Sequence, residues 1–375
     1  MSTHPFSGIR VLDFSQGVAG PHCGMLFALY GADVIKVEPP EGDWSRPLGT
    51  SDGTMSALFA AYNQGKRGLA LDVRKTDEHA LARELVRGAD VLIENYRPGV
   101  GERLGLDYET LSSDNEKLIH VSISGFGLAG PESHRPATDS ILQAYCGLVN
   151  LNRGLDGVPH RIRFPAIDHV TGLYAFQAAI VALVSRGMSG RGQHLDTSLF
   201  QSTVAFQGGK ILDHHASGGH APEEPYSPLG IYPTKDGLIS ISTVRERHFR
   251  DLCTILGCRE LANDPRFESN DRRMQRIDEL NTILAEHFEQ RTTDDWARRL
   301  TAQGIMNSTI RTYDELLADE HVAESDAIRM VAQPGLDQVP IARVPGTANS
   351  YKRPAPRLGE HNAEILDELA KLRHG

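Results

Sequence analysis

Cysteine is scarce in this sequence. The 375 residues contain only four, Cys23, Cys146, Cys253 and Cys258, and these form neither a C-x-x-C pair nor a regularly spaced framework. This excludes a scaffold held by disulfides, and it predicts buried free thiols in a reducing compartment.

Long apolar runs and an excess of positive charge are also absent. No stretch approaches the roughly 18 apolar residues that span a bilayer, and residues 1–7 lack the basic start and apolar run of a signal peptide. With 39 basic and 49 acidic residues, the formal net charge is −10, which argues against a basic face for nucleic acid. We therefore expect a cytoplasmic protein with no membrane and no nucleic-acid partner.

Several catalytic motifs are missing or lie in the wrong context. The sequence has no G-x-S-x-G, so the serine elbow of an α/β-hydrolase is unsupported. His214, His215 and His220 lack the helical spacing of a ligand pair, so we expect no metal. A literal G-x-G-x-x-G spans residues 125–130, but Pro131 follows where the dinucleotide fingerprint needs a helix, which favours a turn.

The first half does contain an alternation of strand and helix patterns. Residues 9–37 read as a strand, a glycine-bearing loop, a helix and a second strand, and apolar runs at 91–93 and 118–123 continue the series. Such βαβ units build a parallel sheet with helices on its faces. The sequence therefore predicts an α/β fold.

The second half changes character. Residues 170–185 form a helical pattern that is apolar on nearly every side, which predicts a buried helix. Residues 214–228 are rich in His, Gly, Pro and Glu and suggest a linker, and residues 231–243 predict a strand pair with a turn at 235–237. Residues 259–329 are helical, polar and acidic, which indicates a separate small domain.

Asp168 directly precedes the apolar helical pattern and has two interpretations. As an N-cap, its carboxylate would accept a backbone N–H from the first helical turn, where the helix dipole favours a negative charge. A rigid, partly shielded carboxylate in the same place is also well suited to act as a nucleophile.

Basic residues cluster between Lys66 and Arg103. This segment holds eight bases and seven acids, a balance of +1 in a chain whose net charge is −10. The cluster is either scattered surface charge or a local site for one anionic ligand.

At this point the sequence resembles the class III CoA-transferases, a family that includes formyl-CoA:oxalate and carnitine CoA-transferases and, as a side branch, the α-methylacyl-CoA racemases. The resemblance runs along almost the whole chain, in an order and spacing that are specific. It rests on GIRVLDF at 8–14, GADVIKVEPP at 31–40, NQGKRG at 63–68, ENYRPGV at 94–100, SGFG at 124–127, GRGQ at 190–193, YPTKDG at 232–237 and LGEH at 358–361.

The resemblance implies a fold and an assembly. It implies a Rossmann-like large CoA-binding domain of residues 1–200, to which residues 335–375 return, a linker at 201–228 and a smaller α+β domain at 229–330. It also implies that each chain forms an open ring and that two rings interlock as a homodimer, with the site between domains of different subunits.

The resemblance further implies an enzyme that exchanges CoA between an acyl-CoA donor and a carboxylic-acid acceptor. Asp168 stands at the position of the family's nucleophile, which forms an aspartyl anhydride and then an aspartyl-CoA thioester. CoA would be held as a substrate, without a metal, by Lys36, Asn95, Tyr96, Arg97 and Arg103.

Departures from the relatives bear on the substrate. The racemase branch carries a histidine and an aspartate where this chain has Thr138 and Asp139, so the exchange of an α-proton lacks one base, although Glu246 falls where that branch carries a supporting glutamate. Val18 and Thr138 replace the pocket glutamine and tyrosine of the formyl transferase, and its glycine-run loop is absent. A larger or less polar acid than oxalate is therefore favoured.

Arg161 and Arg163 lie close before Asp168. Either residue would orient the substrate carboxylate, and the alternative interpretation is that it is a surface cation. Two alternatives to a transferase stay open at this level. One is an α-methylacyl-CoA racemase-like isomerase, and the other is a non-catalytic CoA-binding relative.

Overall fold

The structure, a computed structural model, describes residues 4–154, 157–219, 224–346 and 353–374, so His220 lies outside the described residues. The chain divides into two compact units, one of residues 1–210 with 326–375 and one of residues 211–325. Each unit has its own core.

The first unit is built on a parallel sheet of six strands, which confirms the predicted α/β fold. The strand order is β3-β2-β1-β4-β5-β6. This order reverses between β1 and β4, and in open sheets of this kind a crevice forms outside the carboxyl ends of the strands at such a point. The strands are β1 (Arg10–Asp13), β2 (Asp33–Glu38), β3 (Arg67–Ala70), β4 (Val91–Glu94), β5 (Ile119–Ser124) and β6 (Gln193–Ser198).

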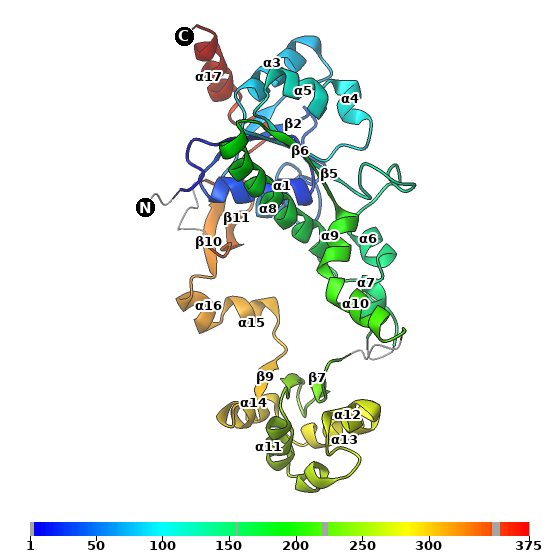
Figure 1. The fold of residues 1–375 in the computed structure, drawn as a ribbon. Coiled ribbons are helices and arrows are strands. Elements are labelled where there is room, and N and C mark those ends of the chain that lie inside the picture. The colour runs from blue at the N-terminus through cyan, green and yellow to red at the C-terminus, as the bar shows by residue number, and fades with distance from the viewer. Residues whose placement is uncertain (1–3, 155–156, 220–223, 347–352, 375) are drawn as a thin grey trace. The chain divides into compact units, whose positions relative to one another are not determined.

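Helices cover both faces of this sheet (Figure 1). Val11 and Val91 point to one face and join the core cluster that includes α1 and α8, whereas Leu12 and Leu92 point to the other and join α3, α5 and α17. Burial on both faces explains why the inner strands β1, β2 and β4 are mostly apolar runs with little alternation. The helices are α1 (Ala19–Leu29), α3 (Thr76–Arg87), α5 (Tyr108–Asp114), α8 (Ala166–Ser189) and α17 (Asn362–His374).

Helix α8 departs from expectation in two ways. It is the one helix in the described residues that is long and apolar enough to cross a membrane by composition, although the sequence was expected to hold no such stretch. It is also not buried all round. Ala175 and Ala179 pack inward where α1 approaches closely, while Val181 and Met188 are exposed, because the small residues occupy the inner face and larger ones the outer.

Shorter elements complete the first unit. An antiparallel hairpin of β10 (Ile328–Gln333) and β11 (Asp337–Ala342) lies in the C-terminal part of this unit, residues 326–375. Asn362 Oδ1 accepts a hydrogen bond at 2.9 Å from the N–H of Ala70, the last residue of β3. Within the segment predicted as a linker, residues 201–206 and 208–216 are helical. The remaining helices are α2 (Ala57–Asn63), α4 (Val100–Leu104), α6 (Asp139–Tyr145), α7 (Leu148–Leu151), α9 (Leu199–Phe206) and α10 (Gly208–Ala216).

The second unit combines a small antiparallel sheet with helices. Strands β7 (Leu229–Pro233), β8 (Leu238–Ser242) and β9 (Met306–Thr309) pair in that order, and the β7–β8 hairpin confirms the predicted strand pair. Phe288 and Trp296 are central to its core. Its helices are α11 (Glu246–Leu256), η1 (Arg259–Asn263), α12 (Asn270–Gln275), α13 (Ile277–Phe288), α14 (Thr293–Ala302), α15 (Tyr313–Leu317) and α16 (Glu320–Glu324).

Candidate active site

A cavity of about 300 Å³ opens at the carboxyl ends of β1, β4 and β5, where the strand order reverses. This is the place where open α/β sheets bind their ligands. Six residues that the sequence singled out line it: Val18, Asn95, Tyr96, Arg97, Thr138 and Asp168. The fold therefore brings the predicted nucleophile and three predicted CoA contacts to one cavity.

Asp168 is the third residue of α8 and does not cap it. The helix begins at Ala166 after Pro165, which makes no side-chain cap. The capping carboxylate belongs to Asp139 at the start of α6, whose Oδ2 accepts hydrogen bonds from Ile167 N at 2.6 Å and Asp168 N at 3.2 Å. The N-cap interpretation of Asp168 is wrong because a residue from another helix does that work, which leaves the Asp168 carboxylate available to the cavity.

The environment of Asp168 favours the protonated form of its carboxyl group. Burial, and then the nearby negative charge of Asp139, raises the pKa of Asp168 to about 7. Both causes disfavour the ionised form, the first through the loss of solvation and the second through repulsion. Near neutral pH, Asp168 is therefore divided between a carboxylic acid and a carboxylate.

Both carboxylate oxygens of Asp139 accept hydrogen bonds within the protein. Its Oδ1 accepts a hydrogen bond from Gln143 Nε2 at 2.6 Å, while Oδ2 caps α8. Thr138, beside it, lines the cavity as the residue before α6. These contacts indicate that Asp139 positions Asp168.

The loop after β4 is held in shape by its own side chains. Asn95 Oδ1 accepts from Gln16 N at 2.9 Å and Asn95 Nδ2 donates to Gln16 O at 2.8 Å, which ties this loop to the loop after β1. Glu94 Oε2 accepts from Tyr96 N at 2.6 Å. Asn95 thus organises the cavity wall by contacts with backbone.

Arg74, Arg97 and Arg103 are the exposed members of the basic cluster that line cavities, and Arg74 is paired with Asp72 at 2.7 Å. Arg97 lines the cavity with Asp168, and Arg103 lines a neighbouring cavity of about 460 Å³. Gln16 and Tyr96 line both cavities, so the two adjoin. Within the described residues, the guanidinium groups of Arg97 and Arg103 have no ion pair or hydrogen bond.

Lys36, a predicted CoA contact, is placed elsewhere. Its side chain is fully buried, its ammonium lies 3.0 Å from Asp43 Oδ2 and it donates to Ser15 O. Burial alone would lower the pKa of this ammonium, but Asp13 and Asp43 raise it, so the charge is retained inside. Lys36 faces the interior because it is an inward residue of a central strand, and the structure does not bring it to either cavity.

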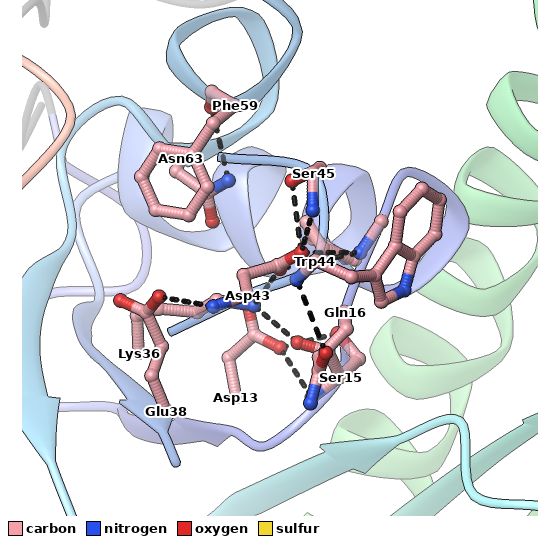
Figure 2. Close-up of polar contacts among 12 residues, drawn as sticks. Asp13, Ser15, Gln16, Lys36, Glu38, Asp43, Trp44, Ser45, Phe59 and Asn63 are labelled. Carbon is pink, nitrogen blue, oxygen red and sulfur yellow. Dashed lines mark hydrogen bonds and ion pairs between the residues drawn. The ribbon is translucent and has the colours of Figure 1, made fainter. Parts of the chain in front are cut away.

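Lys36 belongs to a buried network of charges beside the loop after β1 (Figure 2). Lys66 Nζ donates to Asp13 Oδ2 and Asn63 Oδ1, both at 2.7 Å. Asp43, paired with Lys36, accepts from Gly17 N at 3.1 Å and from Ser45 N at 2.9 Å. Lys36, a predicted CoA contact, and Lys66, a member of the basic cluster, are therefore placed in buried structural pairs.

Two further predicted residues lie outside the cavity lining. Arg163 is exposed in the segment before α8. Glu246 is in the second unit, where Oε2 lies 2.9 Å from Arg273 Nη1 and Oε1 accepts from Asn270 N at 3.0 Å. Hydrogen bonding to Arg273 lowers the pKa of Glu246, which identifies it as an ion-pair partner within its own unit.

The structure also adds residues that sequence reasoning missed. Trp44, His134 and Arg135 all line the cavity with Asp168. They come from irregular segments, where no periodicity marks them. The one available signal was that Trp44 is one of only two tryptophans and lies beside a motif of the resemblance.

No group of three His, Cys, Asp or Glu side chains within the described ranges is arranged to hold a metal ion. The four cysteines are free thiols, three of them buried and Cys146 half-buried.

Comparison with known proteins settles the family. The sequence model of CoA-transferase family III matches residues 6–362. The chain belongs to this family. It is 35% identical to the succinate–glutarate CoA-transferase of Agrobacterium fabrum, over 98% of this chain and 96% of that protein. It is 33% identical to the acetyl-CoA:oxalate CoA-transferase of Acetobacter aceti, with the same coverage.

The fold agrees with this assignment. A crystal structure of a CaiB/BaiF family protein from Brucella suis superposes with a TM-score of 0.86 at 34% identity, covering 97% of this chain and 99% of that one. The protein is thus an enzyme of the class III CoA-transferases, which take CoA thioesters as substrates.

Proposed function

We propose that this class III CoA-transferase moves CoA from an acyl-CoA donor to a carboxylic acid through covalent intermediates on Asp168. The observation that carries the proposal is the shared cavity at the strand ends, lined by Asp168 together with Asn95, Tyr96 and Arg97. A carboxylate on a rigid helix start, next to a side chain that can pair with phosphate, suits nucleophilic attack on a CoA thioester.

The proposed chemistry proceeds by exchange at carbonyl carbons. The Asp168 carboxylate attacks the donor thioester, so a C–O bond forms, the C–S bond breaks, and CoA leaves as a thiolate. The thiolate attacks the Asp168 carbonyl of the anhydride, which gives the aspartyl-CoA thioester and releases the donor acid as a carboxylate. The acceptor carboxylate then attacks this thioester, and the returning thiolate takes the acceptor acyl group and restores Asp168. No proton is consumed overall.

We infer that CoA occupies both adjoining cavities. Arg97 and Arg103 are the cations we assign to its phosphates, because Arg74 in the same cavity lining is already paired with Asp72. Tyr96 and Gln16 line both cavities. The combined space suits a long ligand with an anionic end and a reactive thioester end. Lys36 is not part of this proposed CoA site, because its side chain is buried and paired with Asp43.

For the acceptor carboxylate, Arg135 is better placed than Arg163. Arg135 lines the cavity, and its guanidinium lies 5.5 Å from the Phe126 ring centroid and 5.3 Å from that of Tyr145. Its ion pair with Glu132, at 3.0 Å, is solvent-exposed, so it competes weakly with a bound acid.

We further propose that the enzyme is a homodimer. The outer surface of α8 and the following helices exposes large apolar side chains, which a soluble monomer rarely leaves as a continuous patch. They include Leu173, Tyr174, Val181, Val184, Met188 and Phe206. Size-exclusion chromatography with light scattering tests this: the mass should be twice 41.1 kDa. A double change of Val181 and Met188 to Glu should shift the mass toward the monomer.

The interlocked-ring form of that dimer, the domain boundaries, the cytoplasmic location, and the absence of metal, membrane and nucleic-acid partners stay predictions from the sequence. The uneven charge supports binding of one small anion by an otherwise acidic protein.

The deciding experiment is covalent trapping. Incubation with a panel of acyl-CoA donors and mono- and dicarboxylic acids, followed by hydroxylamine and mass spectrometry, should mark Asp168 and reveal the best donor and acceptor. Asp168→Ala should abolish both the adduct and transfer while it keeps the fold. Transfer at the wild-type rate in Asp168→Ala would contradict the proposal.

The same assay separates the alternatives. A racemase-like isomerase would wash solvent deuterium into the α-position without any acceptor acid, and His134 is the histidine among the described lining residues that could serve as its base. A non-catalytic relative would bind CoA and form no adduct.

A further inference from the structure

Trp44 is an unusually exposed aromatic in the candidate active site. Its side chain is 55% exposed, whereas the other tryptophan of the chain, Trp296, is 1% exposed in the core of the second unit. Trp44 lines the same cavity as Asp168. A large apolar ring left open beside a reactive carboxylate is poorly explained by packing of the free protein alone, and it points to contact with a ligand.

The backbone on both sides of Trp44 is anchored. Asp43 is buried and accepts hydrogen bonds from Gly17 N at 3.1 Å and from the hydroxyl of Ser45 at 2.8 Å, with Lys36 paired against it at 3.0 Å (Figure 2). The buried Lys36 holds the anionic Asp43 in place, and Asp43 joins the loop after β1 to the loop that carries Trp44. The charge network thus serves as a support for this aromatic residue.

The indole itself rests on Gly17. A Cβ atom built on Gly17 would lie 2.3 Å from Trp44 Cζ2, and Gly17 has a φ of +83°. Any larger residue at this position would displace the ring and strain the backbone. The local sequence therefore fixes where the ring lies at the cavity wall.

We propose that the Trp44 indole covers the acyl group of the aspartyl anhydride and keeps water from it. This inference rests on the proposed function, because the anhydride is its intermediate. An anhydride reacts with water unless the site excludes it. The chain lacks the glycine-run loop of the formyl transferase, and Trp44 is a large apolar side chain that stands exposed at the wall of the cavity.

The competing reaction that Trp44 suppresses is hydrolysis of the aspartyl anhydride. Water attacks the acyl carbonyl of the anhydride, the C–O bond to Asp168 breaks, and the donor acid leaves as a carboxylate. One proton of the water goes to the CoA thiolate and the other to solvent. The net result is an acyl-CoA split into acid and free CoA with no product thioester.

The first test measures contact by tryptophan fluorescence and does not depend on turnover. Asp168→Ala keeps the thioester intact, and the double variant Asp168→Ala/Trp296→Phe leaves Trp44 as the sole tryptophan. Acetyl-CoA should shift its emission to shorter wavelength as the exposed ring becomes covered. Asp168→Ala/Trp44→Phe should show no shift, and the difference between it and Asp168→Ala gives the same answer if the core change at Trp296 impairs folding.

The second test measures the partition between hydrolysis and transfer with the best donor and acceptor from the trapping screen. Trp44→Ala should raise the ratio of hydrolysis to transfer by about tenfold, as expected for the loss of roughly one aromatic contact. Trp44→Phe, which keeps an apolar ring, should stay close to wild type. Phe164→Ala is the matched control, since Phe164 is 51% exposed and does not line the cavity.

The outcomes are distinct. An unchanged ratio in Trp44→Ala, or an absent fluorescence shift, overturns the role of Trp44 even when transfer proceeds. A fluorescence shift in a protein that transfers CoA to no acid would refute the proposed function and still establish the contact between Trp44 and the thioester.

Discussion

Asp139 caps the helix that presents Asp168. Its Oδ2 accepts the N–H groups of Ile167 at 2.6 Å and of Asp168 itself at 3.2 Å, so one carboxylate holds the backbone of the other. The arrangement fixes the position of the Asp168 side chain, and it places a second negative charge near it.

Removing the Asp139 cap should separate these two effects. Asp139→Ala leaves two N–H groups of α8 without their acceptor, which should lower the free energy of unfolding by about 1–2 kcal/mol. Asp139→Asn keeps an oxygen acceptor and removes the charge, so the pKa of Asp168 should fall while the stability loss is smaller. Urea denaturation measures the first effect, and the pH profile of transfer measures the second. An unchanged profile in Asp139→Asn would show that burial alone sets the pKa.

The rate of CoA release from the donor should rise with pH through about 7. Burial and Asp139 raise the pKa of Asp168 to about 7, and only the carboxylate attacks the thioester. Below that pH, the single-turnover rate should fall about tenfold per pH unit. A profile that stays flat between pH 5 and pH 8 would contradict the assignment of Asp168 as the titrating nucleophile.

Stability should show the opposite dependence on pH. The pKa of Asp168 is higher in the folded state than in the unfolded chain, so the folded state binds more protons and loses stability as pH rises through about 7. Asp168→Asn removes this loss. Its gain in urea midpoint over wild type should therefore be larger at pH 8 than at pH 5, and an equal difference at both values would contradict the raised pKa.

The sheet could be predicted because apolar runs such as residues 118–123 are buried on both faces and bounded by loops. The nucleophile candidate could be found because the family resemblance places its nucleophile at Asp168, close before the apolar pattern of residues 170–185. The capping role of Asp139 could not, because the two residues are 29 positions apart and belong to different helices.

Lys36 and Trp44 both lie where sequence patterns would not place them, one in the interior and the other at the cavity. A lysine in a charged motif suggests a phosphate contact, yet its partner Asp43 comes from the next loop and draws it into the interior. A tryptophan suggests core, yet Trp44 is held at the cavity because its neighbours are anchored and Gly17 leaves room for the ring. In both cases the deciding neighbour, Asp43 or Gly17, lies in a loop whose conformation is set by tertiary contacts.

A pair of variants tests whether Lys36 is structural. Lys36→Met leaves Asp43 buried without its cation, which should cost about 3–5 kcal/mol of unfolding free energy. Arg97→Gln should leave stability within about 0.5 kcal/mol and raise the KM for acyl-CoA, because Arg97 is exposed and has no ion pair in the described chain. Thermal denaturation measures the stability of each variant, and steady-state kinetics measure its KM for acyl-CoA. A Lys36→Met protein with wild-type stability and a raised KM would restore Lys36 as a CoA contact.

Arg135 should govern the acceptor acid and leave the donor largely unaffected. Arg135→Gln removes the guanidinium that lines the cavity beside Phe126 and Tyr145, so the KM for the acceptor should rise about 10-fold or more, as for the loss of one charge-assisted hydrogen bond. The trapping of the donor adduct on Asp168 should continue, because that step precedes acceptor binding. Arg163→Gln serves as the matched control, since Arg163 is exposed and does not line the cavity. If Arg163→Gln raises the acceptor KM and Arg135→Gln does not, the carboxylate is bound from the segment before α8, and the acceptor enters from that side.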